Sequence, residues 1–321
     1  MDPTHLRTLQ EIVKHGGFSR AARALHRSQP AVSHHIRQLE ADLGVRVLDR
    51  VGKRAFPTAA GATLLAQAGP ALEQLELARQ AVQGLRGRVA GRVSLGTGAT
   101  FATYVLPAVL GPLRRRYPEL ELVVVTGNAS DVVAAVGDNA LDLGIVTLPA
   151  AARHLDVSPF AVDALVAIAP PGPGWKRGRP VDARELAGHP LICYERRGAI
   201  RAVIDEWFRR AGAAPRIAME LGNAEAIKRM VEAGLGVGLT SAITVRADLA
   251  AGRLVARTLS PALARGLAVV RRKDKPVSAA LGALLAALEA SRPRAARALA
   301  PPGRRRGSSG PPAAGQTMLA P

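Results

Sequence analysis

The 321-residue chain has a single cysteine and no apolar run long enough to cross a membrane. One cysteine, Cys193, excludes an internal disulfide framework and any multi-cysteine metal site. We find neither a signal peptide nor a membrane segment, so we expect a soluble, cytoplasmic protein without a membrane partner. Cys193 lies in the apolar stretch PLICYE, where packing in a buried strand is the favoured interpretation and redox sensing is the alternative.

The chain also lacks the residue patterns of an enzyme. It has no nucleophile paired with a base, no glycine-rich phosphate loop with its lysine, and no clustered metal ligands. His5, His15, His26, His34 and His35 lie near the start, which leaves only His154 and His189 elsewhere. We therefore expect no catalytic residue, no metal and no cofactor.

Positive charge is plentiful, because 44 Lys and Arg face 25 Asp and Glu, a formal net charge of +19. Such a balance favours polyanionic partners, although the excess need not lie on one binding face. Residues 294–321 are rich in Pro, Gly, Ala and Arg, have little apolar bulk, and are predicted to form a disordered tail. Arg304, Arg305 and Arg306 could touch DNA nonspecifically, but a solvated tail is the favoured interpretation.

Residues 19–40 read as two short helices joined by a tight turn. Ser28 is predicted to cap the second helix, with Pro30 tolerated in its first turn. Val32, Ile36 and Leu39 recur at helical spacing and should point inward, which leaves a polar face suited to base edges and phosphates. The predicted DNA-binding residues of this helix are Ser28, Gln29, Pro30, Ser33, His34 and Arg37. For His34, base contact and plain solvent exposure remain equally open.

A first helix before this pair and a wing after it complete the pattern. Asp2 and Pro3 should begin the first helix and Gly16 should end it. Residues 45–61 read as a two-stranded wing whose basic tips, Arg50, Lys53 and Arg54, would grip the DNA backbone. A short helix-turn-helix pattern alone could be a tight corner of a core, but three helices and a basic wing in this order favour DNA binding.

Residues 4–66 resemble the winged helix-turn-helix of LysR-type transcriptional regulators. The resemblance is carried by SQPAVS at 28–33, IRQLEADLG at 36–44 and the T-x-x-G of Thr58 and Gly61. Two departures are His34-His35, where the family more often has arginine and glutamine, and Pro57, where an aliphatic residue is usual. The resemblance implies double-stranded DNA as a partner.

Residues 59–90 are predicted to form a linker and dimerisation helix. Apolar residues alternate at spacings of four and three, which is typical of a seam between two helices: Leu64, Ala68, Ala71, Leu75, Ala78, Val82 and Leu85. The alternative is that this stripe packs on its own chain. Gly69-Pro70 should bend the helix. The resemblance implies a homodimer that assembles to a tetramer, and RNA polymerase as a further partner.

From Gly91 the pattern changes to short apolar strands alternating with helices, which predicts an α/β domain with largely parallel sheets. Residues 91–293 resemble the effector-binding domain of LysR-type regulators, through ALDLGI at 140–145 and VEAGLGVGLTSA at 231–242. The second motif departs at Leu239-Thr240 from the family's usual leucine-proline. The resemblance implies the fold of type 2 periplasmic binding proteins, with lobe one at 92–163 and 268–293 and lobe two at 164–267.

A small-molecule site is predicted in the cleft between these lobes, where strands end in polar residues. Helix starts near Thr100 and an arginine after a lobe-two strand would suit an anionic metabolite. The predicted effector-binding residues are Ala99, Thr100, Phe101, Asn128, Thr147, Glu195 and Arg196. Thr100 or Ser130 alone is more simply a helix cap, and only their convergence favours a ligand. Glu195 indicates that the ligand need not be a simple anion.

The predicted architecture is an N-terminal all-α winged helix-turn-helix at 1–58, a linker helix at 59–90 and a two-lobed α/β effector domain at 91–293. The corresponding hypothesis is a sequence-specific, DNA-binding transcriptional regulator, not an enzyme, controlled by a small-molecule effector. The rival hypothesis is a solute-binding module whose helical front end only mediates assembly.

Overall fold

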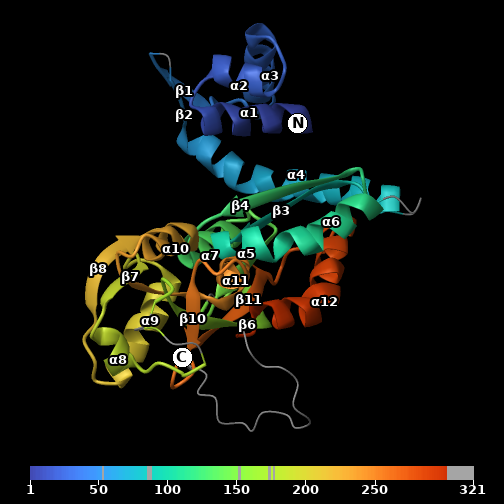
Figure 1. Cartoon of the computed structure of the whole chain (residues 1–321). Helices are drawn as coiled ribbons and strands as arrows, with labels where there is room; N and C mark the ends of the chain where they lie inside the picture. The colour runs from blue at the N-terminus through green and yellow to red at the C-terminus, as the bar shows by residue number, and fades with distance from the viewer. Residues whose placement is uncertain (53, 85–88, 151–152, 173–174, 176–177, 302–321) are drawn as a thin grey trace. The chain divides into compact units, whose positions relative to one another are not determined.

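A computed structural model describes residues 1–52, 54–84, 89–150, 153–172, 175 and 178–301. The chain divides into two compact units, Met1–Gly87 and Arg88–Pro321, each with its own core (Figure 1).

The first unit is a three-helix bundle with a two-stranded wing and a long helix. Its elements are α1 (Pro3–His15), α2 (Phe18–Ala24), α3 (Gln29–Leu43), β1 (Leu48–Val51), β2 (Arg54–Pro57) and α4 (Ala59–Gly84). The predicted helix ends are confirmed: the Asp2 carboxylate accepts from the Thr4 amide, Gly16 ends α1 in the left-handed conformation, and the Ser28 hydroxyl accepts from the Ala31 amide. Leu9, Val32 and Leu39 are fully buried in the core of this unit.

The T-x-x-G motif has a clear structural reason. The Thr58 hydroxyl donates to the Arg46 carbonyl and accepts from the Gly61 amide, which ties the end of the wing to the start of α4. A Cβ at Gly61 would lie 2.0 Å from the Val47 carbonyl oxygen, so only glycine fits there. Glu40 of α3 accepts from the Val47 amide at 2.9 Å and so fixes the start of the wing to α3.

Helix α4 runs without interruption through Pro70. The predicted seam divides into two parts. Leu64 and Ala68 pack on the core of their own unit, together with Leu72, so the dimer interpretation is wrong for this first part. The second part, Ala71, Leu75, Ala78 and Val82, is exposed, whereas Leu85 lies outside the described residues.

The second unit is built on one twisted sheet of nine strands among its described residues. They are β3 (Gly91–Thr97), β4 (Leu120–Thr126), β5 (Leu143–Thr147), β6 (Leu155–Ala169), β7 (Pro190–Tyr194), β8 (Arg216–Leu221), β9 (Val237–Ser241), β10 (Val255–Thr258) and β11 (Ala264–Arg272). Their order is β4-β3-β5-β11-β6-β9-β7-β8, with β10 also paired to β6.

The sheet is mixed, not largely parallel as predicted. β3, β4 and β5 are parallel in one half, and β7, β8 and β9 are parallel in the other. β6 and β11 are antiparallel to each other, β11 is also antiparallel to β5, and β6 is also antiparallel to β9. The chain crosses from one half of the sheet to the other along β6 and returns along β11. The short strand β10 gave no recognisable sequence signal.

Helices cover both halves of this sheet (Figure 1). They are α5 (Ala99–Tyr104), α6 (Leu106–Arg116), α7 (Ala129–Gly137), α8 (Ala183–Ala187), α9 (Ala199–Arg210), α10 (Ala224–Glu232), the 3₁₀ helix η1 (Ala242–Val245), α11 (Arg246–Ala250) and α12 (Ala279–Leu299). Each half of the sheet, with its helices, forms one lobe with a hydrophobic core of its own. Leu95, Leu143 and Leu284 are buried in the core of lobe one, and Ile168 and Ile204 are buried in the core of lobe two. Cys193 is fully buried on β7, as predicted.

The prediction that a disordered tail begins at residue 294 is wrong. Helix α12 continues to Leu299, and Ala295 and Leu299 are buried in the core of lobe one. These two residues lie four apart, so they share a helix face and extend the apolar stripe of α12 past Pro293. The Arg246 guanidinium donates to the Arg297 and Ala300 carbonyls at the end of this helix. Residues 302–321 lie outside the described residues.

Candidate DNA interface and effector cavity

Helix α3 has one buried face and one exposed polar face. Val32, Ile36 and Leu39 are buried, whereas Gln29, Pro30, His34 and Arg37 are exposed and Ser33 is half-buried. The Ser28 hydroxyl caps the helix at 3.3 Å from the Ala31 amide nitrogen. This exposed face has the donors and acceptors that base edges and phosphates require.

The two neighbouring histidines of α3 have different surroundings. His34 is exposed, whereas the half-buried His35 has its Nδ1 2.9 Å from the Thr8 hydroxyl and its ring 5.0 Å from that of His5. Burial lowers the pKa of His35, and the nearby His5 and Arg27 lower it further. His35 therefore joins α1 to α3, and only His34 belongs to the exposed face.

The wing presents exposed arginines on both strands. The Arg50 guanidinium lies 4.1 Å from the centre of the Phe18 ring, and that of Arg54 lies 5.9 Å from the Phe56 ring. Arg50 is thus held over α2 by a cation–π contact while its edge stays exposed. Lys53, the third predicted wing residue, lies outside the described residues.

A cavity of about 500 Å³ lies between the two lobes of the second unit. Six of the seven predicted effector residues line it: Ala99, Thr100, Phe101, Asn128, Thr147 and Glu195. The walls come from the ends of β3, β4 and β5 and from the first turns of helices in both lobes.

In the described part of the unit, four helices begin at this cavity. Their N-cap residues are Gly98 of α5, Asn128 of α7, Gly198 of α9 and Asn223 of α10. The first amides of a helix lack intrahelical acceptors and carry the positive end of the helix dipole. Helix starts from both lobes therefore favour negative charge in the space between them.

The prediction for Arg196 is wrong. Its side chain is 80% exposed, does not line the cavity, and forms an ion pair with Glu220 at 3.2 Å. Glu220 also pairs with Arg201, at 3.0 Å. Arg196 lies in the turn after β7, where its guanidinium pairs with Glu220 of the neighbouring strand β8 and not with the cavity.

Arg265 of β11 is the cavity cation that the sequence analysis missed. Its Nε donates to Asp163 Oδ2 at 2.8 Å and its Nη1 donates to Thr147 Oγ1 at 2.9 Å. The Ser241 hydroxyl donates to the other oxygen of Asp163. Both charged residues are buried, and the only sequence signal was a lone charge inside each of two apolar strand runs.

Tyr194, on the lobe-two wall, is a neutral phenol. Its hydroxyl lies 2.9 Å from that of Thr240, and burial raises the pKa of Tyr194 to about 12. In the described residues no group of His, Cys, Asp or Glu is arranged to hold a metal. No helix of the described chain has the length and apolar character needed to cross a bilayer.

Fold and site together define a winged helix-turn-helix DNA-binding unit linked to a two-lobed domain with a small-molecule cavity. Residues 3–62 match the family model described as a bacterial regulatory helix-turn-helix protein of the lysR family, and residues 86–292 match the LysR substrate binding domain. The chain belongs to the LysR family of transcriptional regulators, which combine a DNA-binding domain with an effector-binding domain.

Among its relatives, the chain is 36% identical over 278 residues to the uncharacterised HTH-type transcriptional regulator YeiE of Escherichia coli (strain K12), covering 86% of this chain and 93% of the relative. It is 34% identical over 287 residues to the HTH-type transcriptional regulator CbbR of Xanthobacter flavus, covering 88% and 86%. A solved structure of a full-length OxyR variant from Pseudomonas aeruginosa shares the fold, with a TM-score of 0.70, 24% identity and coverage of 91% and 97%.

Proposed function

We propose that this regulator binds a small effector with an anionic group in the cavity between its lobes, and that occupancy changes how its winged helices engage DNA. The observation that carries the proposal is the convergence of helix N-termini from both lobes, with Arg265, on one cavity of about 500 Å³. An anion there would accept from backbone amides and from the hydroxyls of Thr100 and Thr147.

The proposed DNA contacts divide into two kinds. Gln29, Ser33, His34 and Arg37 face outward on α3 and would contact base edges, while the first turn at Ser28 and Pro30 would approach a phosphate. Arg50, Lys53 and Arg54 of the wing would hold the backbone irrespective of sequence.

The proposed assembly is a homodimer through the exposed part of α4, and the resemblance to LysR-type regulators supports extending the proposal to a tetramer and to contact with RNA polymerase. We divide the chain into a DNA-binding domain at 1–58, a linker helix at 59–90 and an effector domain at 91–293. With DNA as the proposed partner, we place the site of action in the cytoplasm. No catalytic step is needed for any of these roles.

The test is a calorimetric titration of small carboxylates and phosphates against three proteins: wild type, Thr100→Val and Thr63→Val. Thr100→Val keeps the volume but removes a cavity hydroxyl, and should weaken binding by about 1–3 kcal/mol. Thr63 of α4 lies in the other unit and bonds only to the Ala59 carbonyl, so its variant should bind like wild type. If none of these compounds binds wild type, or if Thr100→Val binds unchanged, the proposal fails.

A further inference from the structure

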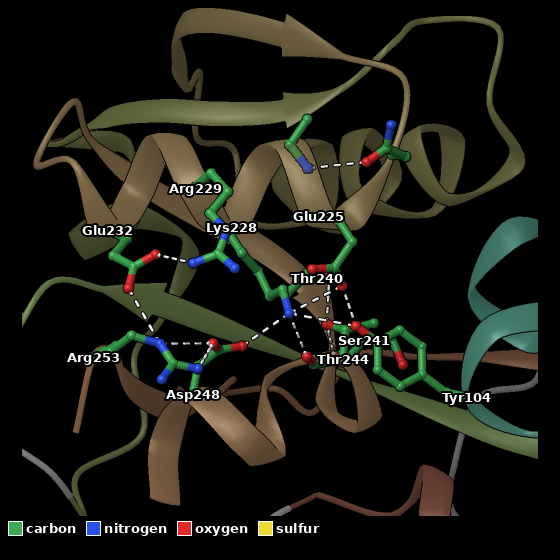
Figure 2. A network of polar contacts seen from close by, with 12 residues as sticks. Tyr104, Glu225, Lys228, Arg229, Glu232, Thr240, Ser241, Thr244, Asp248 and Arg253 are labelled. Atoms are coloured by element: carbon green, nitrogen blue, oxygen red, sulfur yellow. Dashed lines mark hydrogen bonds and ion pairs between the residues drawn. The ribbon is translucent and has the colours of Figure 1, made fainter. Parts of the chain in front are cut away.

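A polar bridge joins the two lobes at the edge of the effector cavity (Figure 2). Tyr104, the last residue of α5 in lobe one, donates its hydroxyl to Glu225 of α10 in lobe two. Lys228 of α10 lies 3.3 Å from the Tyr104 hydroxyl and 2.9 Å from Glu225 Oε1. Tyr104 and Glu225 also line the cavity, so the bridge is part of its wall.

The lobe-two end of the bridge is held firmly. The Lys228 ammonium is buried and also donates to the Thr244 carbonyl and to Asp248, both at 2.8 Å. Arg253 holds the other oxygen of Asp248 at 2.5 Å. Burial lowers the pKa of Lys228, but its bonds to Asp248, Glu225 and Tyr104 outweigh that effect and raise it, so the ammonium stays charged.

The lobe-one end is equally fixed by packing. Phe101, one turn before Tyr104, and Leu106 just after it are buried in the core of lobe one. On α10, Ile227 and Val231 are buried in the core of lobe two. A hydroxyl placed by one core therefore meets a carboxylate and an ammonium placed by the other. Burial, and then the bond to Glu225, raise the pKa of Tyr104, which keeps the phenol protonated as a donor.

We propose that Tyr104, Glu225 and Lys228 form an inter-lobe bridge that fixes the width of the effector cavity, with Tyr104 as a positioning residue for effector binding. The crossing strands β6 and β11 join the lobes but leave a hinge rotation open, and a side-chain contact away from them can set its angle. A ligand that accepts from Tyr104 or donates to Glu225 competes with the bridge. Occupancy of the cavity thereby changes the lobe angle.

The proposal of an inter-lobe bridge rests on the proposed function only in identifying the cavity as the effector site. If Tyr104 served only to pack its ring, Tyr104→Phe would behave like wild type, because this variant keeps the ring and removes only the hydroxyl. Glu225→Ala removes the acceptor from the opposite lobe, at a half-exposed position that tolerates the change. Tyr117→Phe is the matched control, because Tyr117 packs on the lobe-one core and makes no contact with α10 in the described structure.

The experiment measures the distance between spin labels on the full-length protein, with no ligand added. Labels go on Ala134→Cys of α7 and Ala202→Cys of α9, exposed positions on opposite lobes. Cys193 is fully buried and burial raises its pKa to about 11, so it stays unlabelled. Labelled protein is diluted with unlabelled protein so that distances within one chain dominate.

We expect Tyr104→Phe and Glu225→Ala each to add a second, longer distance, with Tyr117→Phe unchanged. The double variant should match the single variants, because both remove the same contact. A ligand that competes with the bridge should bind either Tyr104→Phe or Glu225→Ala about tenfold more tightly than wild type, because the bond between the lobes no longer has to be broken and the partner that remains is free to bond the ligand. Unchanged distances in both variants, or the same shift in Tyr117→Phe, would overturn the bridge and leave the effector proposal intact. If none of the small carboxylates and phosphates binds wild type, the effector proposal is overturned and the bridge is left intact.

Discussion

Gln29 and Arg54 lie on the two parts of the first unit for which we propose DNA contacts, and both side chains are exposed. Gln29 begins the recognition helix, where its amide can donate and accept at a base edge. Arg54 lies on the wing, beside Phe56, where we propose that its guanidinium contacts the DNA backbone.

Gln29→Ala should therefore reduce discrimination between sites by about 1–3 kcal/mol per base pair read, whereas Arg54→Ala should weaken all sequences together. Binding sites selected from random duplexes, compared with scrambled DNA at fixed salt concentration, provide the measurement. Equal losses on selected and scrambled DNA for Gln29→Ala would refute its role as a reader.

Arg265 and Asp163 form a buried ion pair at the floor of the cavity. Arg265→Met leaves a buried carboxylate without its counter-ion and should lower the free energy of unfolding by about 3–5 kcal/mol. Arg196→Met removes an exposed pair and should leave stability unchanged within error. Urea unfolding of the two variants provides the comparison. A stable Arg265→Met would show that the pair is dispensable for the fold.

At the scale of elements, the two parts of α4 have different partners. Its start packs on the winged-helix core, while Leu75 and Val82 are 52% and 61% exposed and available to a second copy. Leu75→Asp should dissociate the proposed dimer, because it places a charge in the apolar stripe through which we propose the two copies pair. Gln74→Asp adds the same charge at the neighbouring position outside the stripe and should not. If Leu75→Asp sediments as a dimer at low micromolar concentration, α4 is not the main interface.

The contact of α10 with α11 should make stability sensitive to acid. Burial alone would raise the pKa of Asp248, but its bonds to Lys228 and Arg253 outweigh burial and lower it below the ordinary 3.8. A carboxylate with a lowered folded pKa contributes stability above its unfolded pKa and loses it as the pH falls through the folded value. Wild type should therefore be more stable than Asp248→Asn at neutral pH.

This difference should begin to shrink at about pH 4, where Asp248 of the unfolded chain starts to protonate, and should disappear as the pH falls through the lower folded pKa. Urea midpoints at several pH values measure the effect, with Asp138→Asn at the exposed end of α7 as the control. A gap between wild type and Asp248→Asn that stays constant down to pH 2 would contradict the assignment.

Local features were predictable from the sequence, and long-range pairings were not. The Ser28 cap, the outward face of α3 and the helix starts near Thr100 and Asn128 follow from neighbouring residues alone. Arg265 was missed because its partner Asp163 is 102 residues away. Arg196 was misplaced because it lies in the turn after β7, and its partner Glu220 comes from a strand 24 residues further along the chain. The first part of α4 was misassigned because heptad spacing does not say which surface it meets.

At the scale of the whole molecule, the account requires coupling between two separate units: a ligand held by one must change the DNA contacts of the other. Such coupling is a free-energy difference between states and must appear equally in both binding reactions. The bridge at Tyr104 and the hinge strands β6 and β11 give the second unit two lobe angles for this purpose. In the proposed dimer, the linker α4 would connect these changes to the two DNA-binding units.

The most direct test follows the DNA footprint of wild type and Thr100→Val while a ligand identified by calorimetry is titrated in. The account predicts that the footprint or DNA affinity changes with a midpoint equal to the calorimetric Kd. It also predicts that this midpoint moves to higher ligand concentration in Thr100→Val by the same factor as the Kd, with the ligand-free footprint intact. A ligand that saturates the cavity while the footprint stays the same would contradict the account.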